Sequence, residues 1–256
     1  MNHPLHKTLC LFLAAMLALA LVPGAAPAED DIHVVILGTS DMHGNILGYT
    51  YEDNSPTTNN GMARLYTYIK KIREENPIVF LVDAGDDIQG TIMTDDIANK
   101  FPDSEHPVIA AMNFMGYDAM TLGNHEFNWG IGTMKAILSQ AAFPVLGANI
   151  LNQNGSYVTG RGWTLVERGG VRLAVIGVCT PDIPIWDGEK AGIAETTFEA
   201  GSTAVRKCIE EIGGQADIIL VSSHMGLYPE FDQENGSDAF LGGFPPLRTA
   251  RLRIYI

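Results

Sequence analysis

Five apolar runs in this chain are each followed at once by a short polar cluster, and this alternation most constrains the fold. Segments with helical spacing separate the runs, which are nearly continuous in Val, Ile and Leu. Strands that are buried on both faces have this composition, and they are typical of a mostly parallel sheet covered by helices. The sequence therefore predicts an α/β fold. The runs are VVILG, IVFLV, AMTL, LAVIGV and IILV.

The expected helices and strands alternate along the chain. Apolar residues recur at helical spacing in residues 61–75, and Pro77 ends that segment. Two strand-like runs on either side of Gly169 and Gly170 predict a hairpin. Further helices are expected over 107–115, 132–140 and 197–212, and strands over 32–38, 78–82, 119–122, 144–146, 163–167, 171–178 and 217–221.

Composition excludes some classes of protein. The chain of 256 residues is 46% hydrophobic, which excludes an intrinsically disordered protein and allows one α/β domain with a full core. Its formal net charge is −14, so it is a poor binder of nucleic acid polymers, and we expect no such partner. The negative charge either helps to concentrate divalent cations or only keeps the protein soluble. The sequence leaves the oligomeric state open.

The first 28 residues predict a secretory signal peptide. Lys7 precedes a nearly all-apolar run from Thr8 to Val22, and Ala26-Pro27-Ala28 offers a small-x-small cleavage site. The apolar run is shorter than the roughly 20 residues that a membrane-spanning helix needs. We therefore expect export to the periplasm, the cell surface or the extracellular medium, with no transmembrane span in the mature chain.

Two cysteines remain after such a cleavage. Cys179 ends a predicted buried strand, and Cys208 lies in a predicted helix. One disulfide would be possible in an oxidising compartment, but these positions favour free, buried thiols.

The polar clusters hold Asp, His and Asn, which are metal-ligand residues. Ligands of a parallel sheet collect beyond the carboxyl ends of its strands, and the clusters fall there. One Asp-x-His or Gly-Asp turn is a weak signal, because both are common. The joint occurrence after successive strands indicates a metal centre. The clusters are Asp41-Met42-His43, Gly85-Asp86-Asp87, Gly123-Asn124-His125-Glu126, Thr180-Pro181-Asp182 and Ser223-His224.

The ligand types match a site for two divalent cations. Two cations about 3.5–4 Å apart assist hydrolysis of a phosphate ester by neutralising its oxygens and acidifying a bridging water. Asp86 lies in a glycine-rich turn and is the predicted bridging ligand. Asp41 and His43 are two residues apart on a segment expected to be extended, so they face one side and hold one metal with Asp86. Asn124 and His224 are the predicted ligands of the other metal.

His125 is the predicted catalytic residue. It is expected to point away from the metals, to contact the substrate together with Asn124, and to stabilise the phosphate or protonate the leaving oxygen. Glu126 is expected to accept a hydrogen bond or shape the turn. Asp182 is expected to be a loop residue outside the ligand set. Residues 45–60 form either a rim over the site or an exposed loop.

Four of the clusters belong to longer motifs, TSDMHGN over 39–45, GDDIQG over 85–90, GNHEFN over 123–128 and SHMG over 223–226. Together they resemble the motifs of the calcineurin-like metallophosphoesterases, and within them the exported 5′-nucleotidase and 2′,3′-cyclic-nucleotide 2′-phosphodiesterase group. The resemblance implies a four-layer α-β-β-α fold and two divalent metal ions, for which Mn, Zn, Fe and Co are all suited. It implies catalysis by His125. It also implies metal binding by Asp41, His43, Asp86, Asn124 and His224.

One departure from the family pattern concerns His125. In the 5′-nucleotidases the matching histidine commonly pairs with an aspartate three residues later, whereas this chain has Asn128. In this respect the chain resembles the cyclic phosphodiesterase branch. An asparagine cannot raise the basicity of an imidazole as a carboxylate does, which weakens the case for His125 as the acid.

A second departure lies at the C-terminus. The family has a further Gly-His-x-His motif and a nucleoside-binding domain, but no histidine follows His224 here. We expect a phosphoesterase domain over 29–243 that is incomplete at the C-terminus. Residues 244–256 form an atypical basic tail, attributed to a frame change near Ala239 to Gly243 or to a truncated gene model. The alternative is a natural tail.

The favoured hypothesis is a metal-dependent hydrolase in which a metal-bridging hydroxide attacks the phosphorus of a nucleotide phosphoester. The substrate would be a 2′,3′-cyclic nucleotide, a 3′-nucleotide or a 5′-nucleotide. One alternative is a non-catalytic fragment of such an enzyme that binds metal weakly. Another is a hydrolase of sugar sulfates or UDP-sugars.

Overall fold

The computed structural model describes residues 32–50, 55–101, 104–226 and 252–255. The predicted signal peptide, residues 244–251 of the predicted tail and the suggested frame change lie outside these residues. The fold is that of the unit that begins at His33. Among the described residues, no helix is long and apolar enough to cross a membrane.

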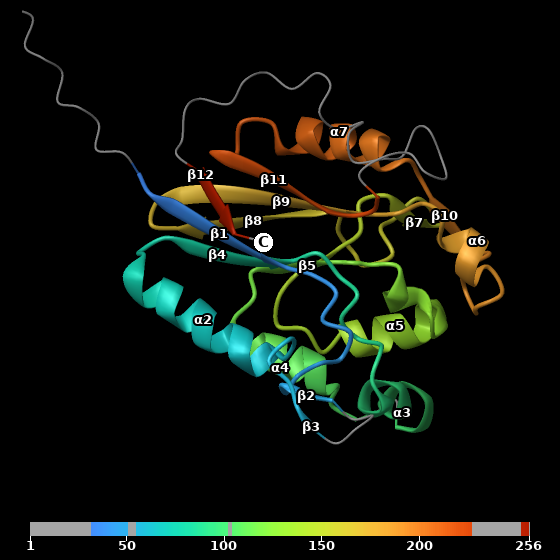
Figure 1. Ribbon diagram of the computed structural model, residues 1–256. Coiled ribbons are helices and arrows are strands. Elements are labelled where there is room, and N and C mark those ends of the chain that lie inside the picture. The colour runs from blue at the N-terminus through green and yellow to red at the C-terminus, as the bar shows by residue number, and fades with distance from the viewer. Residues whose placement is uncertain (1–31, 51–54, 102–103, 227–251, 256) are drawn as a thin grey trace, which may run out of the picture. The chain divides into compact units, whose positions relative to one another are not determined.

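The first sheet has five parallel strands in the order β12-β1-β4-β5-β6 (Figure 1). All residues of β4 are buried, as its apolar sequence predicts. The strand β12, from the predicted tail, pairs with β1 at one edge. The strands are β1 (Val34–Thr39), β4 (Val79–Asp83), β5 (Ala119–Thr121), β6 (Val145–Leu146) and β12 (Leu252–Tyr255).

The second sheet contains β8 (Trp163–Arg168), β9 (Val171–Cys179) and β11 (Ile218–His224) in the order β11-β9-β8. The pair β8 and β9 is antiparallel, so the predicted hairpin is confirmed. The pair β9 and β11 is parallel.

The ends of the strands in the first sheet are in register. Thr39 lies opposite Asp83, and Asp83 lies opposite Met120. The loops that follow β1, β4 and β5 therefore leave the sheet at one edge, where the predicted ligands fall.

Helices cover the outer face of each sheet, which gives the predicted four layers. On the first sheet, Val35 and Leu37 share a buried cluster with residues of the helices α2 to α5, whereas Val34 and Ile36 belong to a second cluster that contains Leu173 of β9. Alternate side chains of β1 thus face opposite layers. The helix α7 (Gly201–Ile212) packs on the second sheet (Figure 1). The other helices are α2 (Met62–Glu75), α3 (Ile92–Lys100), α4 (Pro107–Met115) and α5 (Gly130–Leu138).

Most predicted helices and strands are confirmed within a few residues, and several short elements were not predicted. The helix expected over 197–212 begins at Gly201, because Thr196–Phe198 pairs with Ile150–Asn152 as the strands β10 and β7. The helix α3 was not predicted, and a capping box between Thr91 and Thr94 begins it. The remaining elements are β2 (Tyr49–Thr50), β3 (Ser55–Pro56), the 3-10 helix η1 (His125–Phe127) and α6 (Ile183–Asp187).

The two cysteines outside the predicted signal peptide are free and buried, as predicted. Burial raises the pKa of the Cys179 thiol well above its ordinary value, so this thiol stays protonated.

Candidate metal centre

The loops of the first sheet and the end of β11 bring the predicted ligands together. The Oδ2 atom of Asp86, in the loop after β4, lies 3.2 Å from Nε2 of His224 and 4.0 Å from Nε2 of His43. The same Nε2 of His224 lies 3.1 Å from Oδ1 of Asn124. His43 and His224 therefore converge on Asp86, and Asn124 reaches the same place beside His224.

Asp41 and His43 close the site on the β1 side. Oδ1 of Asp41 lies 3.8 Å from Nε2 of His43. The expected proximity is therefore present, but the extended segment predicted for it is wrong. The strand β1 ends at Thr39, and Asp41 and His43 have φ angles of 55° and 45°. A tight turn, not strand alternation, brings the two side chains together.

Three site residues have a backbone conformation that residues with a Cβ rarely adopt. Asp41, His43 and Asp86, with a φ of 67°, are the non-glycine residues with positive φ in the part of the chain that the structure describes. Each such residue costs on the order of 1 kcal/mol and persists only where the surroundings impose it. Here the N–H groups of Asp41 and His43 donate to the carbonyls of Gly85 and Asp86, both at 2.9 Å.

Glu126 ties the loop after β4 to the loop after β5. Its buried carboxylate accepts hydrogen bonds from the backbone N–H groups of Gly123 at 2.7 Å, of Asp86 and Asp87 at 2.8 Å, and of Ile88 at 3.3 Å. Four donors on one carboxylate fix the backbone on which Asp86 stands. The prediction that Glu126 accepts a hydrogen bond and shapes the turn is confirmed.

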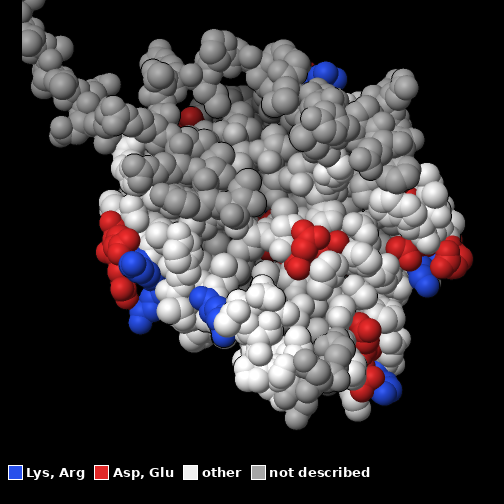
Figure 2. All heavy atoms as spheres, viewed as in Figure 1, with Lys and Arg blue, Asp and Glu red and all other residues white. Residues whose placement is uncertain are grey.

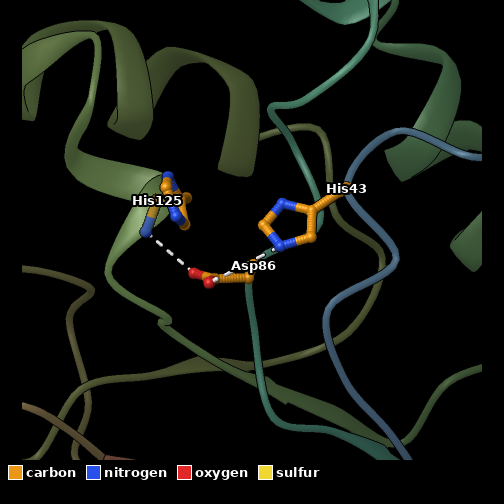
Figure 3. Close-up of side chains that lie close together, drawn as sticks. All are labelled: His43, Asp86 and His125. Carbon is orange, nitrogen blue, oxygen red and sulfur yellow. Dashed lines mark hydrogen bonds and ion pairs between the residues drawn. The ribbon is translucent and has the colours of Figure 1, made fainter.

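Two glycines let these loops approach each other. A Cβ on Gly85 would lie 2.2 Å from the backbone nitrogen of Gly123, and a Cβ on Gly123 would lie 2.2 Å from Oδ1 of Asp86. No side chain fits at either position. The close approach lets Oδ1 of Asp86 accept the backbone N–H of His125 at 2.8 Å (Figure 3).

Asp86 and His224 hold opposite charges. Burial acts to raise the pKa of Asp86, but the hydrogen bond and charge of His224 outweigh it and lower that pKa. Burial acts to lower the pKa of His224, but the hydrogen bond and charge of Asp86 raise it to about 9. Because imidazole binds metal in its neutral form, a cation must displace the proton of His224.

The neighbouring Asp87 has the opposite ionisation from Asp86. Burial raises the pKa of Asp87 well above its ordinary value, and the adjacent charge of Asp83 raises it further. Asp83 accepts hydrogen bonds from Oγ1 of Thr39 at 2.5 Å and from the N–H of Gly85 at 2.6 Å. Asp87 therefore holds a proton behind the site, while Asp86 presents a carboxylate to it.

His125 contacts the site through its ring and its backbone. Its ring meets that of His43 edge to face, with centroids 5.1 Å apart (Figure 3). Its Nδ1 lies 2.8 Å from Oδ1 of Asn128, and Nδ2 of Asn128 donates to Oδ2 of Asp187 at 3.0 Å. Nε2 is therefore the ring nitrogen that remains for a substrate or a metal.

The convergent side chains fit two divalent cations. One group of possible ligand atoms comes from His43, Asp86 and His125, and another from Asp41, Asp86 and His224, with all atoms of a group within 4.8 Å of one another. Mixed carboxylate and imidazole donors suit divalent transition metals. Both groups contain Asp86, the predicted bridging residue. The assignment of ligands to each metal, and of His125 to catalysis, stays a prediction.

The segment after the first ligand cluster borders the site. A pocket of about 390 Å³ is lined by Asp41 together with Asn45, Asn60 and Arg64. This position agrees with a rim over the site, one of the two interpretations of residues 45–60. Asp182 is the N-cap residue of α6 and belongs to neither ligand group among the described residues.

Basic and acidic side chains lie near one another on part of the described surface. Figure 2 shows the basic side chains of this face in small groups beside acidic ones, over the part that the structure describes. Close pairs of this kind occur among the described residues, for example Lys100 with Asp96 at 2.7 Å.

Three acidic residues of the site, Asp83, Asp87 and Asp187, were assigned no role from the sequence. Asp83 lies three residues before Asp86 and Asp87 directly after it, and their burial beside one another follows from the fold rather than from a motif. Asp187 lies 59 residues from Asn128 on a short helix, so no sequence spacing points to it.

Comparisons with known proteins agree with this geometry. The family model for calcineurin-like phosphoesterases matches residues 34–250. A 2′,3′-cyclic-nucleotide 2′-phosphodiesterase/3′-nucleotidase of Yersinia enterocolitica is 31% identical over 86% of this chain and 35% of that protein. The 5′-nucleotidase of Homo sapiens is 32% identical over 90% of this chain and 41% of that protein. The crystal structure of the calcineurin-like phosphoesterase YfkN from Bacillus subtilis matches with a TM-score of 0.75 and 29% identity, over 82% of this chain and 68% of that one.

The chain spans less than half the length of these two curated relatives. The family match nevertheless includes all five predicted metal ligands and His125. The likeness to a solved structure of the family covers most of the chain. On this evidence the chain belongs to the calcineurin-like phosphoesterase family.

Proposed function

We propose that this chain hydrolyses nucleotide phosphoesters with the help of two divalent cations. The observation that carries the proposal is the carboxylate of Asp86, which belongs to both groups of candidate ligands. A two-cation phosphoesterase needs such a shared ligand. The names of the relatives support a 2′,3′-cyclic nucleotide, a 3′-nucleotide or a 5′-nucleotide as the substrate.

The cations would be held by Asp41, His43, Asp86, Asn124 and His224. Bound divalent cations neutralise phosphate oxygens and lower the pKa of water. The preformed loops contribute by holding the ligands in place before a cation arrives, so little ordering remains to be done on binding.

His125 is the proposed acid for the leaving oxygen. Its Nδ1 is engaged with Asn128, so Nε2 presents the proton to the substrate. Asn124 and the ring of His125 are the proposed substrate contacts. The leaving oxygen of a nucleotide is an alkoxide, which departs far more readily when it is protonated.

We also propose that the protein is exported before it acts. The support is the sequence of residues 1–28, with a basic residue, an apolar run and a small-x-small site. N-terminal sequencing of the protein recovered from the medium or periplasm tests this export. We expect the recovered chain to begin at Glu29, after cleavage behind Ala28.

The test of the activity uses the purified chain with Mn²⁺ or Zn²⁺. Hydrolysis of bis(p-nitrophenyl) phosphate and of cyclic, 3′- and 5′-nucleotides is followed, and His125→Ala is expected to lower nucleotide turnover by at least about 100-fold. His33→Ala, at an exposed histidine, is the matched control and should leave turnover unchanged. A folded chain that binds metal but turns over none of these substrates would instead be a non-catalytic fragment.

A further inference from the structure

We propose that Asp187 is a positioning residue for His125 and acts through the side chain of Asn128. The inference rests on the proposed function, since it assigns a role to a residue that supports the acid of that reaction. It connects α6, which begins far along the chain, with the loop after β5.

The three side chains form a continuous chain of hydrogen bonds. Nδ1 of His125 lies 2.8 Å from Oδ1 of Asn128, and Nδ2 of Asn128 lies 3.0 Å from Oδ2 of Asp187. Asp187 is 8% exposed, although Ile185 and Trp186 on the same short helix are 74% and 45% exposed. The helix α6 therefore turns its acidic residue inward, toward the site.

The carboxylate of Asp187 decides which way the amide of Asn128 faces. The two ends of an amide have nearly the same shape, so its hydrogen-bond partners set its direction. An ionised carboxylate only accepts hydrogen bonds, so it holds Nδ2 of Asn128 and leaves Oδ1 facing His125. His125 must then carry a hydrogen on Nδ1, which directs Nε2 to the substrate.

Backbone contacts join the segment after α6 to the start of α5, which follows Asn128 in the chain. The N–H of Ile131, at the start of α5, donates to the carbonyl of Ala191 at 2.9 Å. A Cβ on Gly130 would lie 2.7 Å from that same oxygen, so the two segments are in close contact. The distance between Asp187 and Asn128 therefore does not depend on the two side chains alone.

This arrangement explains how an asparagine serves at a position where a carboxylate would be expected to pair with the histidine. Asn128 carries no charge, but Asp187 places a negative charge one side chain further from the imidazole. An aspartate at position 128 would put two carboxylates in contact at about 3 Å, which is unfavourable.

The first experiment compares two leaving groups. p-Nitrophenolate leaves without a proton, whereas the ribose oxygen of a 3′-nucleotide needs one. Asp187→Ala is expected to lower kcat for the nucleotide about tenfold and kcat for p-nitrophenyl phosphate less than about twofold. Asp96→Ala, at a side chain that is 47% exposed, is the control and should change neither. An equal loss on both substrates, or a loss on neither, would overturn the inference.

An exchange of the two side chains adds a rescue. Asn128→Asp alone is expected to lower nucleotide turnover, because it places the new carboxylate against that of Asp187. The double variant Asn128→Asp/Asp187→Asn restores one carboxylate and one amide, and it should recover turnover to within about threefold of the wild-type chain. A double variant no better than Asn128→Asp alone would contradict the pairing.

A readout without turnover separates this inference from the proposed function. In the ¹⁵N-labelled protein at alkaline pH, NMR should show that the ring hydrogen of His125 is on Nδ1. In the Asp187→Ala variant, it should show a mixture of both tautomers of His125. That result in a chain without activity would count against the proposed function and support the positioning. A hydrogen on Nε2 in the wild-type chain would overturn the positioning, whatever the activity.

Discussion

The two sheets contribute to the site unequally. The first sheet supplies four of the five predicted ligands, on loops that are joined by backbone hydrogen bonds and by the carboxylate of Glu126. The second sheet supplies His224 from the end of β11. Two contacts tie this ring to the segment after β4: Nδ1 lies 2.8 Å from the carbonyl of Ala84, and Nε2 lies 3.2 Å from Oδ2 of Asp86.

This difference separates two ways of building a metal site. The loops of the first sheet hold their ligands by local contacts that include strained backbone at Asp41, His43 and Asp86. His224 instead depends on how one sheet packs on the other, through the apolar layer that contains Phe80 and Leu173. We call the loops of the first sheet the first half of the site, and His224 on the second sheet the second half. A substitution in the first half should therefore weaken the binding of both cations, and a substitution in the second half should weaken the binding of one.

The largest effect is expected at the shared carboxylate. Asp86→Ala removes a ligand from both groups and should lower turnover by at least about 1,000-fold, since bound cations contribute several kcal/mol to the transition state. Metal content and phosphodiester hydrolysis measure it. Asp96→Ala is the control. An Asp86→Ala variant that still binds two ions would contradict the comparison, because the metal binding of the first half would then not require the shared ligand.

A smaller loss is expected where the loops touch. Gly123→Ala places a methyl group against Oδ1 of Asp86 and should lower turnover about 100-fold by displacing the carboxylate. Gly132→Ala is the matched control, because a Cβ there meets nothing within 4 Å and lies in a helix, where alanine is favoured. Equal activity of the two variants would mean that the close approach of the loops does not position Asp86.

His224→Ala tests the second half. It should lower the affinity of one cation by about tenfold or more and leave the other nearly unchanged, because the loops of the first sheet stay intact. Calorimetric titration with Zn²⁺ resolves the two binding events. Equal weakening of both ions would show that the halves are not independent.

The sequence predicted which residues lie together at the site, but not the backbone turn that carries two of them. Asp41, His43, Asp86, Asn124 and His224 were all predicted, because clusters at the carboxyl ends of parallel strands must meet at one edge. The left-handed backbone at Asp41 and His43 was not predicted, since glycine is the residue that indicates such a conformation in a sequence.

Contacts between distant segments were also missed. The contact between Asn128 and Asp187 joins the loop after β5 to the helix α6, and packing sets the distance between them. The buried pair of Asp83 and Asp87 resembles any acidic turn in sequence. Local pattern predicted which residues carry the chemistry. The partners that orient them follow from tertiary structure.

The smallest predicted effect concerns pH and the helices that support the first sheet. Burial lowers the pKa of His106, at the start of α4, to about 4, against about 6.5 in the unfolded chain. The unfolded state therefore binds the proton more tightly, and stability from this group is lost as pH falls from about 6.5 to 4. At pH 5.5 the loss should be about 1 kcal/mol.

Urea unfolding at pH 7.5 and 5.5 measures this loss. Between these two pH values, the unfolding free energy of His106→Gln should decrease by about 1 kcal/mol less than that of the wild-type chain. The same pH dependence in both chains would contradict the assignment to His106.

The central claim is that one carboxylate joins two cations. Electron paramagnetic resonance of the chain loaded with Mn²⁺ tests it most directly, because two ions that share Asp86 at about 4 Å are exchange-coupled. We predict the spectrum of a coupled pair, which Asp86→Ala abolishes. A spectrum of isolated ions, or a chain that binds a single ion, would contradict the account.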